Sequence, residues 1–253
     1  MDPLIIVLLT VASFAAGFVD AVAGGGGLIL MPSLLVAGIP PQMVLGTNKF
    51  AGMSGTATAL INFSRNKKVI WKIAFAGLLF SLTGSVLGTR AILYFNQATT
   101  ATIIVYLLPV AAVITFLPKK RMKSSSAEFS NLNLYLHIPV ICLVIGFYDG
   151  FFGPGTGTFL IFAFYIFLGL HLINASAVAK VFNLASNVGS FFTFLLAHKV
   201  LFSVGIPIAL ANITGGYIGS KLAIQKGQGF IKAFLVIVFV ILFITLLMKY
   251  FHF

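Results

Sequence analysis

The fold is decided by two segments of the sequence, GFVDAVAGGGG at residues 17–27 and GFYDGFFGPGTG at residues 146–157. In each of them an aspartate precedes a tract of glycines inside a long apolar run. Further along the chain the correspondence continues at one offset of 131 residues (180 minus 49), pairing Lys49 with Lys180, Gly84 with Gly215 and Gly88 with Gly219. Because chance does not hold one offset across so many non-apolar positions, the pattern predicts a duplicated unit.

The composition indicates a membrane protein. Apolar residues make up 60% of the 253 residues, charged residues make up 8%, and the mean hydropathy is +1.10, whereas a soluble domain carries about 25% charged residues. Apolar runs of about 20 residues recur, and each is long enough to cross about 30 Å of hydrocarbon. The alternating segments of about 10 residues that form membrane strands are absent. The sequence therefore predicts an all-α polytopic membrane protein.

The duplication divides the chain into two transmembrane repeats, residues 1–118 and 134–253, joined by a polar basic linker at 119–133. Each repeat begins with a glycine-broken apolar region, at 4–37 and at 134–170, which is too long for one crossing at about 1.5 Å per residue. Each broken region is either a re-entrant hairpin of two half-helices or one long, bent helix. Three transmembrane helices follow in each repeat, expected at 44–64, 70–92 and 99–117 and at 175–197, 202–222 and 230–249.

The form of the broken regions sets the symmetry of the two halves. Bent helices would give parallel halves, and re-entrant hairpins would give inverted halves, as in many secondary transporters. Apart from Lys49 and Lys180, inverted halves place 11 basic residues on one side and 3 on the other, whereas parallel halves place 10 against 4. The positive-inside rule and the length of the broken regions therefore favour an inverted repeat with both termini outside.

The positive-inside rule also explains the net charge of +12. The 16 basic residues lie mainly in short loops between apolar runs, and the chain has neither a basic stripe nor a soluble domain that would bind nucleic acid. The expected partners are a small anionic substrate and the lipid bilayer, without nucleic acid, and a homo-oligomer is compatible with the sequence. The expected location is the bacterial inner membrane, crossed several times.

Four ionisable residues lie inside the apolar regions, as two corresponding pairs: Asp20 with Asp149, and Lys49 with Lys180. Such residues are costly in a membrane and indicate functional sites. The lysines contact an anionic substrate in one interpretation and are structural in the other. The aspartates either carry protons or cap half-helices and pair with the lysines. In the first case, an anion that binds a lysine releases the carboxylate to take a proton, because a low dielectric favours the neutral carboxyl group.

The glycine tracts predict a second device for binding anions. A helix that begins inside the membrane directs unpaired N–H groups and a positive dipole end at its surroundings, and glycine lets backbone approach a ligand closely. In the alternative interpretation the glycines only permit tight turns. The predicted substrate-binding residues are Thr47, Asn48, Lys49, Lys180, Asn183 and Asn187, with Gly25, Gly26, Gly27, Gly155, Thr156 and Gly157 from the tracts.

Catalytic residues, a metal site and a cofactor are not expected. Cys142 is the single cysteine, and the four histidines lack the spacing of metal ligands. The tract Gly153-Pro154-Gly155-Thr156-Gly157 has neither the preceding strand nor the Lys-Ser/Thr ending of a nucleotide-binding loop. The sequence therefore predicts a protein that is not an enzyme.

Both halves carry motifs of a known family. The stretch from Phe18-Val19-Asp20 to Leu30-Met31-Pro32, followed by Gly46-Thr47-Asn48-Lys49, resembles the TauE/SafE family of sulfite and organosulfur-anion exporters. In the second half the proline-containing glycine tract and Lys180-x-x-Asn183 fit the same family, so that the resemblance covers nearly the whole chain. It implies a secondary carrier, coupled to protons, that exports small anions such as sulfite, sulfonates or small carboxylates.

Two functions from different classes remain open at this point. A secondary anion transporter is the first interpretation, because the chain contains no nucleotide-binding domain that would drive a pump. The alternative is an anion channel, in which the two half-helix ends would serve as a selectivity filter. Coupling to a proton gradient distinguishes the two functions.

Overall fold

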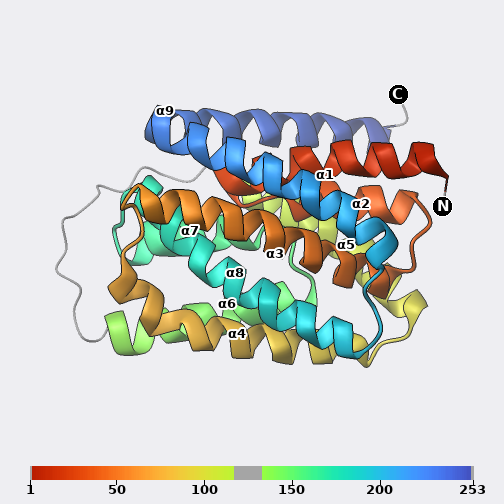
Figure 1. Cartoon of the computed structure of the whole chain (residues 1–253), viewed down its shortest axis with the longest axis horizontal. Helices are drawn as coiled ribbons and strands as arrows, with labels where there is room; N and C mark the ends of the chain where they lie inside the picture. The colour runs from red at the N-terminus through yellow and green to blue at the C-terminus, as the bar shows by residue number, and fades with distance from the viewer. Residues whose placement is uncertain (1, 117–132, 252–253) are drawn as a thin grey trace.

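The computed structural model describes residues 2–116 and 133–251, and every regular element within these two ranges is helical (Figure 1). The first range contains α1 (Pro3–Ala23), α2 (Gly27–Val36), α3 (Pro41–Arg65), α4 (Trp71–Leu93) and α5 (Gln97–Phe116). The second contains a short π-helical turn, η1 (Asn133–His137), then α6 (Ile138–Phe151), α7 (Thr156–Phe167), α8 (Leu172–Leu196) and α9 (Phe202–Phe251). The expected linker at 119–133 lies outside the described residues except for Asn133.

The predicted all-helical chain with several apolar helices is confirmed. In the described ranges, Pro3–Ala23, Trp71–Leu93 and Phe202–Gly227 are long and apolar enough to cross a membrane, and the shorter helices α2, α5, α6 and α7 are also apolar. The two spans expected at 202–222 and 230–249 lie within α9. Gly227 interrupts this element with φ 70°. Figure 1 shows the chain reversing direction within α9, at the end of the molecule opposite the two termini.

Glycines end the first helix of each half where the sequence predicts a break. Gly24 takes a left-handed conformation (φ 83°) after α1, and Gly153 and Gly155 do so after α6 (φ 99° and 85°). Glycine adopts this conformation without the steric cost of a Cβ, which makes it the usual residue after a helix end. The chain then starts a new short helix, and Figure 1 shows the α2–α3 connection at the same end of the molecule as the N-terminus.

The long helices α3 and α8 run antiparallel through the middle of the bundle. Near the start of α3, the Thr47 hydroxyl accepts a hydrogen bond of 3.0 Å from the N–H of Leu201, just beyond the end of α8. At the other end, Asn174 in the first turn of α8 donates a hydrogen bond of 3.0 Å to the carbonyl of Lys68, just beyond α3. These two contacts fix the relative direction of the two helices that carry the buried lysines.

Close packing between glycines and backbone joins the two ranges of the chain. A Cβ built on Gly84 of α4 would overlap the carbonyl oxygen of Leu143 in α6, and one on Gly215 of α9 would overlap that of Phe14 in α1. Such small-residue faces let helices approach closely, and van der Waals packing drives helix association in a membrane. Helices α4 and α6, and likewise α1 and α9, therefore lie side by side along much of their length.

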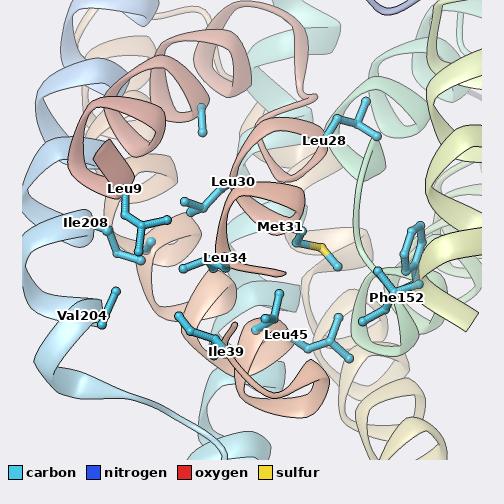
Figure 2. Close-up of a cluster of buried hydrophobic side chains, with 14 of the residues drawn as sticks. Leu9, Leu28, Leu30, Met31, Leu34, Ile39, Leu45, Phe152, Val204 and Ile208 are labelled. Carbon is cyan, nitrogen blue, oxygen red and sulfur yellow. The ribbon is translucent and has the colours of Figure 1, made fainter. Parts of the chain in front are cut away.

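Helix α2 is enclosed by the bundle rather than lying on its surface. Leu30, Met31 and Leu34 of α2 are at most 1% exposed, and Figure 2 shows them between side chains of α1, α3, α9 and the α6–α7 turn. The dense packing of apolar atoms around them holds the helix in place through many weak contacts. This fixes the start of α2, and with it the first glycine tract.

Candidate functional site

The two helix breaks touch each other in the interior of the molecule. A Cβ built on Gly24 would overlap the backbone of Gly157 and Thr158, so this approach requires glycine. The Thr158 hydroxyl donates a hydrogen bond of 2.6 Å to the carbonyl of Ala23, the last residue of α1. The first turn of α7 therefore packs directly on the end of α1.

A cavity of ≈ 40 Å³ lies where the two breaks meet the helices α3 and α8. Eleven of the fourteen residues that the sequence singles out for substrate or proton binding line it. They are Asp20, Gly26, Gly27, Asn48, Lys49, Asp149, Gly155, Thr156, Gly157, Asn183 and Asn187. The structure thus brings together residues that are more than 150 positions apart in the sequence.

The four ionisable residues form two ion pairs that cross between the two described ranges. Lys49 Nζ of α3 lies 2.7 Å from Asp149 Oδ1 of α6, and Lys180 Nζ of α8 lies 2.8 Å from Asp20 Oδ2 of α1. Both lysine side chains and the Asp149 side chain are at most 3% exposed, whereas the Asp20 side chain is 19% exposed. A buried charge without a partner would be strongly destabilising, so each lysine depends on its carboxylate.

The surroundings of Lys180 differ from those of Lys49. The Lys180 ammonium donates hydrogen bonds to the backbone carbonyl of Asp20 and to its carboxylate, and the Thr56 hydroxyl donates to the same carboxylate oxygen at 3.4 Å. Lys180 therefore sits at the end of α1, where a cation also complements the helix dipole. It does not line the cavity, whereas Lys49 does.

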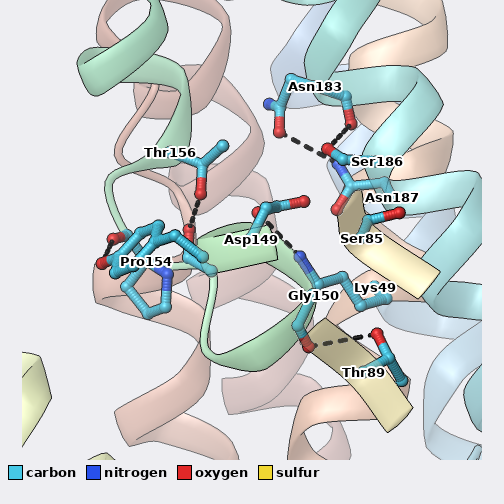
Figure 3. A network of polar contacts seen from close by, with 12 residues as sticks. Lys49, Ser85, Thr89, Asp149, Gly150, Pro154, Thr156, Asn183, Ser186 and Asn187 are labelled. Carbon is cyan, nitrogen blue, oxygen red and sulfur yellow. Dashed lines mark hydrogen bonds and ion pairs between the residues drawn. The ribbon is translucent and has the colours of Figure 1, made fainter. Parts of the chain in front are cut away.

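One buried carboxylate oxygen of a residue that lines the cavity has no partner in the described structure. Asp149 Oδ1 pairs with Lys49, but the buried Oδ2 of Asp149 has no hydrogen-bond partner, and Figure 3 shows this oxygen directed away from Lys49. Buried polar groups almost always have a partner in protein or water. This oxygen is therefore an unpaired acceptor on a residue that lines the cavity.

Hydrogen-bond donors surround the rest of the cavity. Asn187 donates to the side-chain oxygen of Asn183 at 3.4 Å, and the amide groups of Asn48 and Asn183 donate to no protein group in the described ranges. The N–H groups of Gly27 and Gly157, in the first turns of α2 and α7, likewise have no protein acceptor there. Together with the Lys49 ammonium, these groups can surround the oxygens of a small anion.

Three of the predicted site residues lie outside this cavity. Besides Lys180 these are Gly25 and Thr47. Thr47 is fully buried, and its hydroxyl accepts the hydrogen bond from Leu201 that joins α3 to the α8–α9 connection. The position of Thr47 gives it a structural contact, since its hydroxyl is not directed at the cavity.

Seven further residues line the cavity without having been singled out as binding residues: Ala16, Gly24, Leu30, Gly52, Thr56, Gly153 and Asn212. Asn212 of α9 is the most informative, because its amide donates to the carbonyl and the hydroxyl of Ser13 in α1, at 3.0 and 3.1 Å. The sequence signal for it was an isolated amide inside an apolar span. No group of three or more His, Cys, Asp or Glu side chains in the described ranges could hold a metal ion.

Known relatives match the chain over nearly its whole length. The family model described as Sulfite exporter TauE/SafE matches residues 9–246. Probable membrane transporter proteins of Sinorhizobium sp (ORF9) and Haemophilus influenzae are each 38% identical, covering 96% and 92% of this chain and 92% and 91% of the relatives. The probable membrane transporter protein YfcA of Escherichia coli K12 is 33% identical over 94% of this chain and 88% of its own length. No solved structure matches.

Proposed function

Because the chain belongs to the sulfite exporter TauE/SafE family, as its motifs predicted, we propose that this membrane transporter is a secondary carrier of a small oxyanion. One observation carries the proposal. The buried Lys49 ammonium borders a cavity whose other walls include the N-terminal turns of α2 and α7. A fixed positive charge between two helix N-termini suits an anion. The relatives' names as membrane transporters support a carrier rather than an enzyme.

The size of the cavity supports a substrate with few atoms. A water molecule needs about 10–15 Å³ of such space, so ≈ 40 Å³ accepts a few heavy atoms. An inorganic oxyanion of the size of sulfite matches this volume. A longer sulfonate or a carboxylate would bind in a more open conformation of the same site.

The charges at the site support proton coupling. In the structure Lys49 is neutralised by Asp149, so an anion that binds Lys49 competes with this carboxylate. Burying one more negative charge beside a neutral pair is costly in a low dielectric. A proton on an aspartate, either Asp149 or Asp20, removes that cost. We therefore infer that the anion moves together with a proton.

The arrangement of the two halves supports an inverted repeat and alternating access. Helices α3 and α8, which carry the corresponding lysines, run antiparallel, as equivalent helices of inverted repeats do. Each ion pair joins a helix break of one half to the long helix of the other. Rocking one half against the other would open the cavity first to one side and then to the other. The expected location is the bacterial inner membrane, and export is the expected direction.

The experiment that tests this function is counterflow in proteoliposomes. Purified protein is reconstituted, loaded with unlabelled sulfite, and supplied with ³⁵S-sulfite outside, with thiosulfate, sulfoacetate and small carboxylates as competitors. We expect saturable exchange of sulfite and accumulation when a pH gradient is imposed. Exchange of none of these anions would refute the proposal. A steady anion current without saturation or coupling would instead indicate a channel.

A further inference from the structure

We propose that the two crossed ion pairs have different functions: Lys49 and Asp149 bind the anion and its proton, whereas Lys180 and Asp20 only position the break between α1 and α2. The inference rests on the proposed function and assigns its chemistry to one pair. A perfectly twofold site would use both pairs alike. The contacts around the two pairs are not alike.

The first difference is access to the cavity. Both members of the Lys49–Asp149 pair line the cavity, but Lys180 does not. An anion in the cavity can therefore reach the Lys49 ammonium directly. The Lys180 ammonium instead donates its hydrogen bonds to the carbonyl and the carboxylate of Asp20.

The second difference is the number of partners of each carboxylate. Asp20 Oδ2 accepts hydrogen bonds from Lys180 and from Thr56, whereas Asp149 Oδ2 is buried and accepts none. The residue that corresponds to Thr56 at the offset of 131 is Asn187, and its amide donates to Asn183 instead. Among the described residues, Asp149 is therefore the carboxylate with a buried oxygen that lacks a partner, and a proton on this oxygen would lower the cost of burying it.

The third difference is the attachment to the backbone. Lys180 binds the Asp20 carbonyl, which also accepts the N–H of Gly24 at the end of α1. Lys180 thereby fixes the last turn of α1 and the glycine that packs on α7. The Lys180 ammonium stabilises the C-terminal end of α1, where a cation complements the helix dipole. This role does not require a bound anion.

The proton balance follows from this assignment. In the resting site Lys49 is positive and Asp149 is negative. When a singly charged oxyanion takes the place of Asp149 at Lys49, a proton from the adjoining solution binds Asp149 Oδ2. The site then contains Lys49⁺, the anion and a neutral carboxyl group, so its net charge stays at zero. One proton thus accompanies each singly charged anion, and the second ion pair remains intact.

The test compares matched double variants in which each ion pair becomes an amide pair. Lys49→Gln/Asp149→Asn and Lys180→Gln/Asp20→Asn are reconstituted, and ³⁵S-sulfite exchange is measured from pH 5.5 to 8.5. We expect the first variant to lose exchange by about 100-fold or more. We expect the second to keep the pH profile of the wild type even where its rate of exchange falls, because the pair that binds the anion and its proton is unchanged, and an altered profile would overturn the assignment. The titration of sulfite itself is the same in every sample, so differences between pH profiles report on the protein.

A second pair of single variants keeps the test decisive if a double variant does not fold. Asp149→Asn should still exchange sulfite but with a pH profile that is flat beyond the titration of sulfite, whereas Lys180→Arg should keep the wild-type profile. A wild-type profile in Asp149→Asn, or a flat one in Lys180→Arg, would overturn the assignment while leaving the carrier function intact. Failure of the wild-type protein to exchange any of the anions tested in counterflow would instead refute the carrier function.

Discussion

The substitution Gly52→Ala tests whether the cavity is the binding site, because it changes the cavity without disturbing the helix. Gly52 lies in α3 and lines the cavity opposite Asn187. A Cβ at this position would lie 3.6 Å from the Asn187 amide nitrogen, which is ordinary van der Waals contact. The added methyl group therefore fits beside Asn187 without a clash but occupies space that the substrate needs.

The substitution should stabilise the fold and weaken binding of the substrate. Alanine is more favourable than glycine inside a helix by about 0.8–1.0 kcal/mol, so the variant should fold at least as well as the wild type. Inserting a methyl group into a filled site typically costs about 1–3 kcal/mol, which weakens binding by about 5- to 150-fold. The loss should be large because the cavity measures only ≈ 40 Å³.

The assay is ³⁵S-sulfite binding and counterflow, with thermal unfolding in detergent measured on the same preparation. The matched control is Gly55→Ala, three residues further along α3, where a Cβ would overlap the Asn212 side chain and lie 2.8 Å from its carbonyl oxygen. That variant should lose stability, whereas Gly52→Ala should lose binding. Wild-type affinity and turnover in a well-folded Gly52→Ala protein would refute the reasoning.

Three further outcomes are expected. Thr158→Val should lower the free energy of unfolding by about 1–3 kcal/mol, because it leaves the buried carbonyl of Ala23 without its donor; thermal unfolding in detergent checks this, and an unchanged midpoint would contradict the contact. Lys72→Gln removes an exposed charge at the start of α4 and should change exchange by less than about twofold, so that a large loss there would show that exchange responds to net charge and not to the site. A cysteine at Gly38 should react with an impermeant thiol reagent from the side of the N-terminus, and labelling from the opposite side would contradict the re-entrant form.

The sequence predicted the helices well because their signals are local. Apolar length and glycine tracts place α3, α4 and α8 within a few residues of the observed bounds, and the glycine at 227 separates the two spans expected within α9. The linker at 119–133 lies almost wholly outside the described residues. The duplication of the sequence stays a prediction, which the antiparallel α3 and α8 support.

The site was less predictable because its contacts depend on tertiary structure. The sequence identified the aspartates and lysines, but nothing in it showed that Lys49 would pair with Asp149 rather than with the nearer Asp20. It also could not show that Lys49 lines the cavity and Lys180 does not, since the two lysines occupy corresponding positions in similar polar stretches of the sequence. Asn212 escaped notice because a single amide in an apolar helix is usually a packing contact, and here it both packs on α1 and lines the cavity.

The most direct test of the account is equilibrium binding of ³⁵S-sulfite to the purified protein, compared between the wild type and Lys49→Gln. The account predicts saturable binding at one site per chain in the wild type. It also predicts a loss of affinity of about 10-fold or more in the folded variant, because a hydrogen bond to a charged group contributes about 1.5–3 kcal/mol. Equal affinity in the two proteins would contradict the claim that the Lys49 ammonium binds the transported anion.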